Sequence, residues 1–311
     1  MTTYLVRRLL QLIPVTLGLA ALIFLLIHLV PGDPALTLLG PHATPDAVAR
    51  LHRYWHLDDP LWTQFAYFMV RLVQGDFGTS IYYQIPVGDL LMSRMPETVL
   101  LAFCSMLLSI VLALPLAVLV AVYRDRLVDQ AIRVVTLLGF AMPSFWLALL
   151  LMLFFGGKLR WFPVAGYGDT LGDHLYHLVM PSFVVAVSVF PLLLRTLRVG
   201  LLDVLRQDFI RTARAKGLPG HLVMFKHVLR NALLPTITVV GVNLGFLLGG
   251  AVVIESVFAL PGVGYLLVYS VSTRDYPAVE GAALVLALLF VVVNLVTDVT
   301  YSFVDPRIRH R

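Results

Sequence analysis

The sequence predicts an all-helical protein that crosses a membrane several times. Of its 311 residues, 59% are hydrophobic and only 13% are charged, whereas soluble domains carry about 25% charged residues. The apolar residues also gather into long runs, and about 20 of them suffice for a helix to cross ~30 Å of hydrocarbon. The single cysteine, Cys104, lies within one of these runs, so the sequence offers neither a disulfide framework nor a cysteine-based metal site.

Six apolar runs are predicted to span the membrane. They cover residues 9–30, 99–122, 134–155, 179–194, 233–254 and 278–296. The fourth run is short, but a helix that continues past Arg195 and Arg198 would let both side chains reach the membrane surface. The first run exceeds the apolar core of a cleaved signal peptide, about 7–15 residues, and has no clear cleavage site, so we expect it to stay in the membrane.

The distribution of positive charge predicts the orientation of the spans. With the N-terminus in the cytoplasm, the inner segments hold 16 Lys and Arg residues and the outer segments hold 7. The positive-inside rule favours this arrangement, with both termini cytoplasmic. The net charge of +5 is then explained by cytoplasmic loops near anionic lipid, so we expect membrane lipid and no nucleic acid as a partner.

Residues 31–98, between the first two spans, are predicted to form an extracytoplasmic helical insertion. Thr44 opens one helix over 47–55, and Asp59 is predicted to cap a second helix that Pro60 starts. The second helix carries an apolar stripe that consists of Leu61, Phe65, Phe68, Met69 and Leu72.

Motifs for catalysis are missing from the sequence. Neither G-x-x-x-x-G-K-[ST], H-E-x-x-H nor G-x-S-x-G occurs, which excludes ATP binding by a P-loop and disfavours an intramembrane hydrolase. Charged residues are nearly absent from the spans, with only Glu280 and Asp298 toward opposite ends of the sixth. This disfavours the alternative of a secondary carrier or stand-alone channel. We therefore expect no enzyme activity, catalytic residue or bound metal in this chain.

The fifth and sixth spans carry candidates for packing and for a passage. Gly241, Gly245 and Gly249 place three bare backbone patches on one helix face. We expect close packing there, either within the chain or at a subunit interface. Asn243 and Asn294 either line a passage or form interhelical hydrogen bonds.

The segment 257–276 is too polar, and too interrupted by proline and glycine, to span the membrane. Its first turn contains Phe258, Pro261 and Gly262. We expect this segment to act either as an external gate near the passage or as a structural cap over the bundle.

A basic segment, residues 195–232, interrupts the apolar chain with eight Lys and Arg residues against two Asp. Retention of a cytoplasmic loop by charge explains the arginines. It does not explain the pattern of two short helices, 201–216 and 221–232, separated by Gly217, Pro219 and Gly220. Small residues beside that turn favour insertion into a groove on a cytoplasmic partner.

These residues resemble a known family. The run Arg211-Thr-Ala-Arg-Ala-Lys-Gly217, with Leu234-Pro235 beyond it, is similar to the coupling motif of ABC-transporter permeases, E-A-A-x-x-x-G with a later Leu-Pro. Other motifs are similar to the B-type permease of dipeptide, oligopeptide and nickel importers. They are Arg7-Arg8, Pro31-Gly-Asp-Pro34, Gly75-Asp-Phe-Gly-Thr-Ser80, Pro143-Ser-Phe-Trp146, Pro261-Gly-Val-Gly264, Arg274-Asp-Tyr-Pro277 and Val304-Asp-Pro-Arg-Ile-Arg309.

Two departures from the general motif are usual in the peptide and nickel branch. Arg211 and Thr212 stand at the Glu and first Ala positions, and 18 positions separate Gly217 from Pro235. Leu260 precedes Pro261 where relatives often have an aromatic residue, which weakens the assignment of the outer turn.

The resemblance implies a type I ABC importer permease fold in a bacterial or archaeal cytoplasmic (inner) membrane. Its parts would be the first span, 1–30, the insertion, 31–98, and the core, 99–311, with 195–232 as the coupling segment. The partners would be a second homologous permease, two ATPase subunits that bind ATP and Mg²⁺, and an extracytoplasmic solute-binding protein, so this chain would hold no cofactor.

The resemblance also implies site residues and a range of cargo. The ATPase-coupling residues would be Leu205, Phe209, Arg211, Thr212, Ala213, Arg214, Gly217, Leu234 and Pro235. The chain would form half of a translocation pathway for di- or oligopeptides or related small solutes, and nickel, another metal chelate or glutathione are the alternatives within the family.

Overall fold

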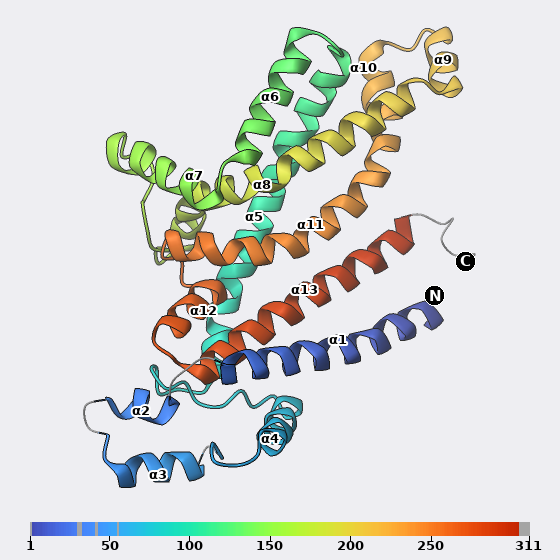
Figure 1. Ribbon diagram of the computed structural model, residues 1–311. Coiled ribbons are helices and arrows are strands. Elements are labelled where there is room, and N and C mark those ends of the chain that lie inside the picture. Colours follow the sequence, from blue (N-terminus) through green and yellow to red (C-terminus); the bar gives the residue numbers. More distant parts are fainter. Residues whose placement is uncertain (1, 30–32, 41–42, 55, 305–311) are drawn as a thin grey trace. The chain divides into compact units, whose positions relative to one another are not determined.

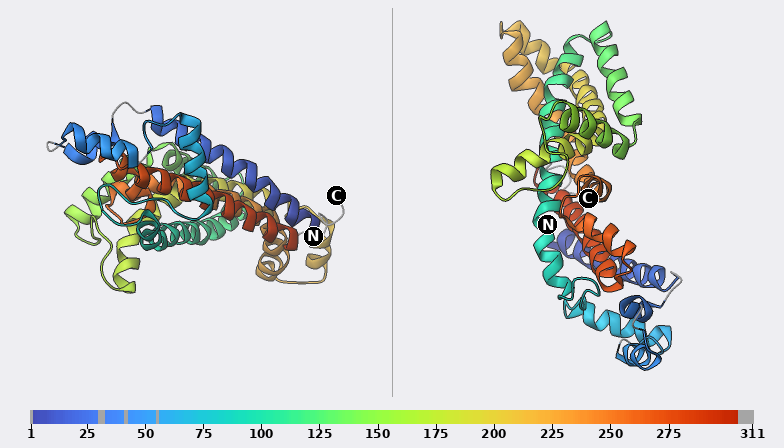
Figure 2. Two further views of the ribbon diagram at one scale, coloured as in Figure 1. Left: turned by 90° about the horizontal axis from the view of Figure 1, so that it is seen from below. Right: turned by 90° about the vertical axis from the view of Figure 1, so that its left-hand side faces the viewer.

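The computed structural model describes residues 2–29, 33–40, 43–54 and 56–304. Within these ranges the chain is helical, apart from turns and an isolated bridge between Thr79 and Pro86. The chain forms two compact units, unit 1 with Met1–Thr98 and Pro261–Val291 and unit 2 with Val99–Leu260 and Val292–Arg311. Figures 1 and 2 show the course of the helices in each unit.

Unit 1 contains the N-terminal helices and the connection between the last two long helices. Its elements are α1 (Thr2–Leu29), α2 (Pro34–Leu39), α3 (Pro45–Tyr54), α4 (Leu61–Val73), α12 (Val263–Ser272) and the first parts of α5 (Val87–Val122) and α13 (Tyr276–Val304). One apolar cluster joins α5, α12 and α13 through Val87, Leu266 and Ala282. A second joins Ala20 and Ile23 of α1 to Leu284 of α13, with α4 packed against it.

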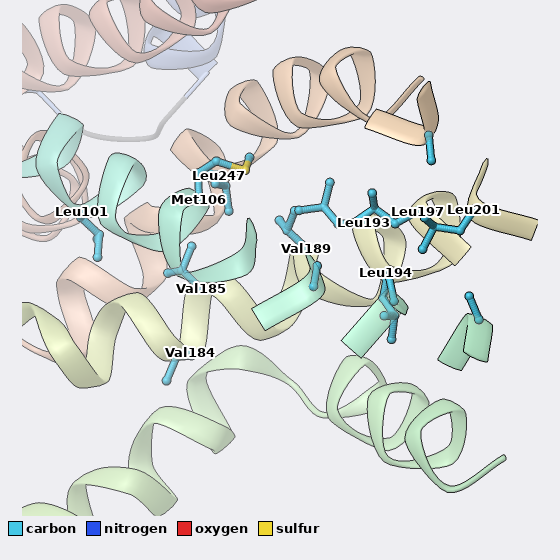
Figure 3. Close-up of a cluster of buried hydrophobic side chains, with 14 of the residues drawn as sticks. Leu101, Met106, Val184, Val185, Val189, Leu193, Leu194, Leu197, Leu201 and Leu247 are labelled. Atoms are coloured by element: carbon cyan, nitrogen blue, oxygen red, sulfur yellow. The ribbon is translucent and has the colours of Figure 1, made fainter. Parts of the chain in front are cut away.

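Unit 2 is built around α8. Besides α8 (Leu171–Leu205) it contains α6 (Leu127–Ala141), α7 (Ser144–Leu151), η2 (Met152–Lys158), α9 (Asp208–Ala215), α10 (Gly220–Leu222), η3 (Val223–Leu229) and α11 (Arg230–Val257). Helix α8 packs against α6, α7 and α11. Figure 3 shows the resulting cluster, in which side chains of α8 meet Met106 of α5 and Leu247 of α11.

The helices confirm the membrane-spanning character, but the count of six spans stays a prediction. Among the described residues, α5, α8, α11 and α13 contain segments long and apolar enough to cross a membrane. In α1, the described apolar stretch is Ile13–Leu25, and the side chains that flank it lie outside the description. The fourth predicted run belongs to the 35-residue α8, which does continue past Arg195 and Arg198 to Leu205.

The predicted span over 134–155 is interrupted at Pro143 in the structure. Helix α6 ends at Ala141, and the chain bends by 101° before it continues through α7 and η2. Pro143 lies at this bend because a proline lacks the backbone N–H that a continuing helix needs, and the residue before it is pushed to extended backbone, as Met142 is with φ −76° and ψ 131°. The pair forms either one broken span or a re-entrant loop.

The two predicted helices of the 31–98 segment are present as α3 and α4. Thr44 caps α3, because its Oγ1 accepts the N–H of Ala47 at 3.3 Å. The predicted cap by Asp59 is wrong: Pro60 is the N-cap of α4 without a side-chain hydrogen bond, and Asp59 instead pairs with His56. Trp55, the last residue of the first predicted helix, lies outside the described residues.

Candidate functional site

Helix α9 is the central element of the basic segment. Asp208 in its first turn and Arg214 in its last turn match the partial charges at the two helix ends. The helix ends in a Schellman motif, in which Gly217 N–H donates to Arg214 at 2.9 Å and Leu218 N–H donates to Ala213 at 3.4 Å. Gly217 has φ +78° and no atom within 4 Å of a Cβ added there, so backbone conformation rather than space requires glycine.

Helix α9 has one face that packs internally and one that is open. Ile210 is 1% exposed and Ala213 is 8% exposed, and both belong to the apolar core of unit 2. Phe209, in contrast, is 41% exposed, and Arg211, Thr212 and Arg214 are exposed as well. The exposed side of α9 thus carries one large apolar side chain among cations and a threonine, and its use as a contact surface stays a prediction.

The structure corrects the predicted helix boundaries and shows which predicted coupling residues pack internally, while their coupling roles stay predictions. The predicted helix 201–216 is wrong as a single helix, because α8 ends at Leu205 and α9 starts at Asp208. Ala213 was expected to allow close approach of a partner, yet its side chain is taken up by internal packing. Leu205 packs partly buried against the same core.

The second predicted helix, 221–232, is continuous through α10, η3 and the start of α11. Leu234 and Pro235 lie further along α11, and their side chains are outside the description. Helix α9 packs against η3, so the basic segment forms a helical hairpin at the ends of α8 and α11 (Figure 1).

Two contacts that the sequence reasoning missed hold the base of this hairpin. A Cβ on Gly200 of α8 would lie 3.2 Å from the carbonyl oxygen of Ala232, so glycine permits the close approach of α8 and α11. Asp129, fully buried at the start of α6, pairs with Arg198 of α8 at 2.8 Å and lies 3.1 Å from Nε of Arg133. The Gly200 contact has no local sequence signal. For Asp129 the available signal was its place near Arg124, Arg126 and Arg133, which favours an ionic partner.

The three glycines of α11 differ in surroundings. A Cβ on Gly241 would lie 1.7 Å from Cγ2 of Thr297, so α11 and α13 approach closely there. Gly245 is buried. Gly249 is exposed and has nothing within 4 Å of an added Cβ, so its patch remains open to contact by another molecule.

The candidate passage residues are placed as follows. Asn243 is 8% exposed, and its side-chain amide donates to the carbonyl oxygen of Val239 in its own helix at 2.7 Å. Asn294 is partly buried in α13. Phe258 is 1% exposed and packs in the core of unit 2, whereas Gly262 is the N-cap of α12 and Pro261 precedes it. The choice between gate and cap stays a prediction.

The second well-defined polar site is an aspartate-pinned loop, residues 75–83, in unit 1. Asp275 is fully buried. Its carboxylate accepts the hydroxyl of Ser80 and the backbone N–H of Ile81 and Tyr82, the latter two at 3.0 and 3.2 Å. The same carboxylate caps α13 by accepting the N–H of Ala278 at 3.3 Å. One side chain therefore joins two of the motifs found in the sequence, Gly75 to Ser80 and Arg274 to Pro277.

The described residues hold no group of three or more His, Cys, Asp or Glu side chains that fits a metal ion. The geometry defines a class of protein: a helical membrane protein with close-packed spans and a basic helical hairpin with an exposed, charged face. The chain belongs to the family described as the binding-protein-dependent transport system inner membrane component, whose model matches residues 113–310. A companion model for the N-terminal part of such components matches residues 1–102.

Curated relatives agree over the full length. The chain is 40% identical to the glutathione transport system permease protein GsiC of Salmonella typhimurium over 311 residues, with 100% of both chains covered. It is also 40% identical to the oligopeptide transport system permease protein AppB of Bacillus subtilis over 317 residues, again with 100% of both covered.

A solved structure supports the fold. The inward-facing MetNI methionine ABC transporter matches with a TM-score of 0.54 and 19% identity, covering 70% of this chain and 96% of that chain. The protein is therefore an ABC importer permease, a multi-pass protein of the bacterial inner membrane that works with ATPase and other subunits and is not itself the ATPase.

Proposed function

We propose that this chain forms half of the pathway of a peptide-type importer and receives the ATP-driven movement through α9. The single observation that carries the proposal is the division of α9 into a packed face and an open face. Ile210 and Ala213 attach the helix to the core of unit 2, while Phe209 and Thr212 are exposed. A partner protein that binds the exposed face of α9 therefore moves a helix that is already packed against the core of unit 2.

Charge supports the kind of partner proposed. The side chain of Arg211 is 79% exposed and has only a 3.5 Å contact with Asp208, whose side chain is 95% exposed. A contact of this kind contributes little stability, so Arg211 remains available to acidic groups on an ATPase. ATP and Mg²⁺ bind to the two ATPase subunits in this proposal, and closure of those subunits rocks the spans between inward-open and outward-open states.

The remaining assembly is proposed from the family and the relatives. A homologous second permease completes the pathway, an extracytoplasmic solute-binding protein delivers the cargo, and both termini lie in the cytoplasm. The cargo is a short peptide, and the class includes glutathione, which is itself a tripeptide. The names of the relatives, a glutathione permease and an oligopeptide permease, support this range.

The test is uptake by the assembled transporter in proteoliposomes. We expect Phe209→Asp to lower ATP-dependent uptake of a radiolabelled dipeptide at least tenfold, because it places a charge in an apolar contact, while the chain still inserts. Phe209→Leu is the matched control and keeps uptake. Normal uptake by Phe209→Asp would contradict the coupling role. Uptake of a nickel chelate but of neither dipeptide nor glutathione would replace the cargo assignment and leave the coupling role intact.

A further inference from the structure

Unit 1 contains a cavity of about 1020 Å³ between α1, α3, α4, the aspartate-pinned loop and the first turns of α13. Its walls combine aromatic and aliphatic side chains, such as Phe24, Phe68 and Leu72, with charged ones. The volume lies at the upper end of the range for small-molecule sites, and a mostly apolar wall with a few polar groups is the usual composition of such a site.

Most polar side chains in the cavity wall are occupied by partners in the chain. His52 lies between Asp33 and Asp58 at 2.8 and 2.9 Å, and His56 contacts Asp59. The amide nitrogen of Gln64 donates to two backbone carbonyl oxygens, and its amide oxygen contacts His28. Because these side chains already have hydrogen-bond partners within the chain, they have few donors or acceptors left to bind a ligand.

The groups of the wall that suit a charged ligand are Glu280, Tyr276 and Arg71. The carboxylate of Glu280 makes no recorded hydrogen bond or ion pair within the described part of the chain, and the cation that acts on it electrostatically is Arg71 of the same wall. The buried hydroxyl of Tyr276 has no hydrogen-bond partner there. The two residues are one helical turn apart on α13 and share a face. Arg71 uses its Nε for Asp76 at 3.0 Å, which leaves its terminal N–H groups for another acceptor.

The position of the Arg71 guanidinium depends on a glycine of the aspartate-pinned loop. A Cβ on Gly78, which has φ +81°, would lie 2.6 Å from Nη2 of Arg71. Glycine therefore lets the guanidinium lie directly over the backbone at the cavity wall. Gly75, with φ +74°, has nothing within 4 Å of an added Cβ, so the same backbone conformation occurs nearby without this contact.

We propose that this cavity binds a small zwitterion, with its ammonium group at Glu280 and its anionic group at Arg71. A carboxylate beside apolar walls needs a cation and hydrogen bonds to offset its lost hydration. A guanidinium with free terminal N–H groups is suited to a carboxylate or phosphate. The Tyr276 hydroxyl donates to the anionic group or to a carbonyl oxygen of the ligand, and the aromatic wall takes its apolar part.

Two sources supply this chemistry: a free short peptide or amino acid, and the headgroup of an ethanolamine phospholipid. The inference does not depend on coupling to an ATPase, so binding is measured on the purified full chain in lipid-depleted detergent without ATP. The peptide probe is alanyl-phenylalanine, compared with its N-acetyl and C-amide forms. The lipid probe is lysophosphatidylethanolamine, compared with lysophosphatidylglycerol, and native mass spectrometry counts the bound molecules.

We expect a zwitterionic probe to bind at least tenfold more tightly than its singly charged counterparts. Glu280→Gln removes the tighter binding of the free dipeptide relative to its N-acetyl form, which has no ammonium group. Arg71→Gln removes the tighter binding of the free dipeptide relative to its C-amide form, which has no carboxylate. Gly78→Ala weakens binding because it displaces the guanidinium, whereas Gly75→Ala carries the same backbone strain and leaves binding unchanged. Preference for the dipeptide or for the lysolipid identifies the source.

The inference is overturned if neither zwitterion binds, or if Glu280→Gln and Arg71→Gln leave both advantages intact. Thermal melting of each variant in the same detergent separates loss of binding from loss of fold. A folded Glu280→Gln chain that still distinguishes the free ammonium from its N-acetyl form would be enough to reject the site.

Discussion

The basic segment and the aspartate-pinned loop both connect long helices, yet they are held in different ways. The loop is fixed by a fully buried carboxylate with several donors. Helix α9 of the basic segment is attached by Ile210 and Ala213 and leaves its charged side exposed. Polar groups that are satisfied internally fix a connection in place, whereas polar groups left at the surface are available to a partner.

The largest effect is expected at Asp275. Asp275→Ala leaves the N–H groups of Ile81 and Tyr82 without their acceptor, which costs about 3 kcal/mol, since hydrogen bonds to charged groups contribute roughly 1.5–3 kcal/mol each. Thermal melting in detergent and chymotrypsin cleavage after Phe77, Tyr82 or Tyr83 measure the loss. Asp275→Asn keeps the shape and one acceptor oxygen and is expected to lose less. Equal melting of Asp275→Ala and wild type would show that the loop is not held by this carboxylate.

The next effect is expected at the end of α9. Gly217→Val forces a β-branched residue to φ +78°, at a cost of about 1–2 kcal/mol, which is roughly a five- to thirty-fold shift in a local equilibrium. Since no atom lies near an added Cβ, Gly217→Asn is the matched control, because asparagine tolerates this conformation. We expect uptake to fall for valine and to be largely kept for asparagine. Equal loss in both would point to a steric contact with a partner instead.

A smaller effect is expected from pH in the α2–α3 region. Hydrogen bonds to Asp58 and then to Asp33 raise the pKa of His52 above its ordinary 6.5. The protonated form is thus favoured in the folded chain, and its contribution is complete below pH 6.5 and lost as pH rises through the raised pKa. As the pH rises through the raised pKa of His52, hydrogen exchange of the α3 backbone amides is expected to accelerate by more than the intrinsic pH dependence of amide exchange. The His52→Gln variant is expected to lose this extra acceleration. If the extra acceleration persists in that variant, His52 is not the group responsible for it.

The sequence predicts the features that depend on local periodicity. The apolar runs indicate the long helices, and α3, α4 and the passage of α8 beyond Arg198 follow from helix signals and charge. The break at Arg206 and Gln207 was missed because the apolar spacing of Leu201, Leu205, Phe209 and Ala213 continues across it. That spacing places the four side chains on one apolar face, but Leu201 and Ala213 are buried in the core whereas Phe209 is 41% exposed.

Contacts between distant residues explain most of the other differences. Ser80 and Asp275 are 195 positions apart, and Gly200 meets Ala232 only because two helices cross there. Neither pair leaves a periodic signal in its own segment. The motifs around Ser80 and Asp275 were both visible as motifs, but the sequence held no indication that they bind each other.

The central claim, that the open face of α9 contacts an ATPase, is tested most directly by cross-linking from single cysteines. In the assembled complex, with Cys104 replaced by Ala, a short thiol-reactive photo-cross-linker is attached to Thr212→Cys or to Ala213→Cys. The exposed Thr212 position is expected to give a cross-link to the ATPase at least tenfold more abundant than the 8% exposed Ala213 position. Equal yields, or a product from residue 213 alone, would contradict the claim.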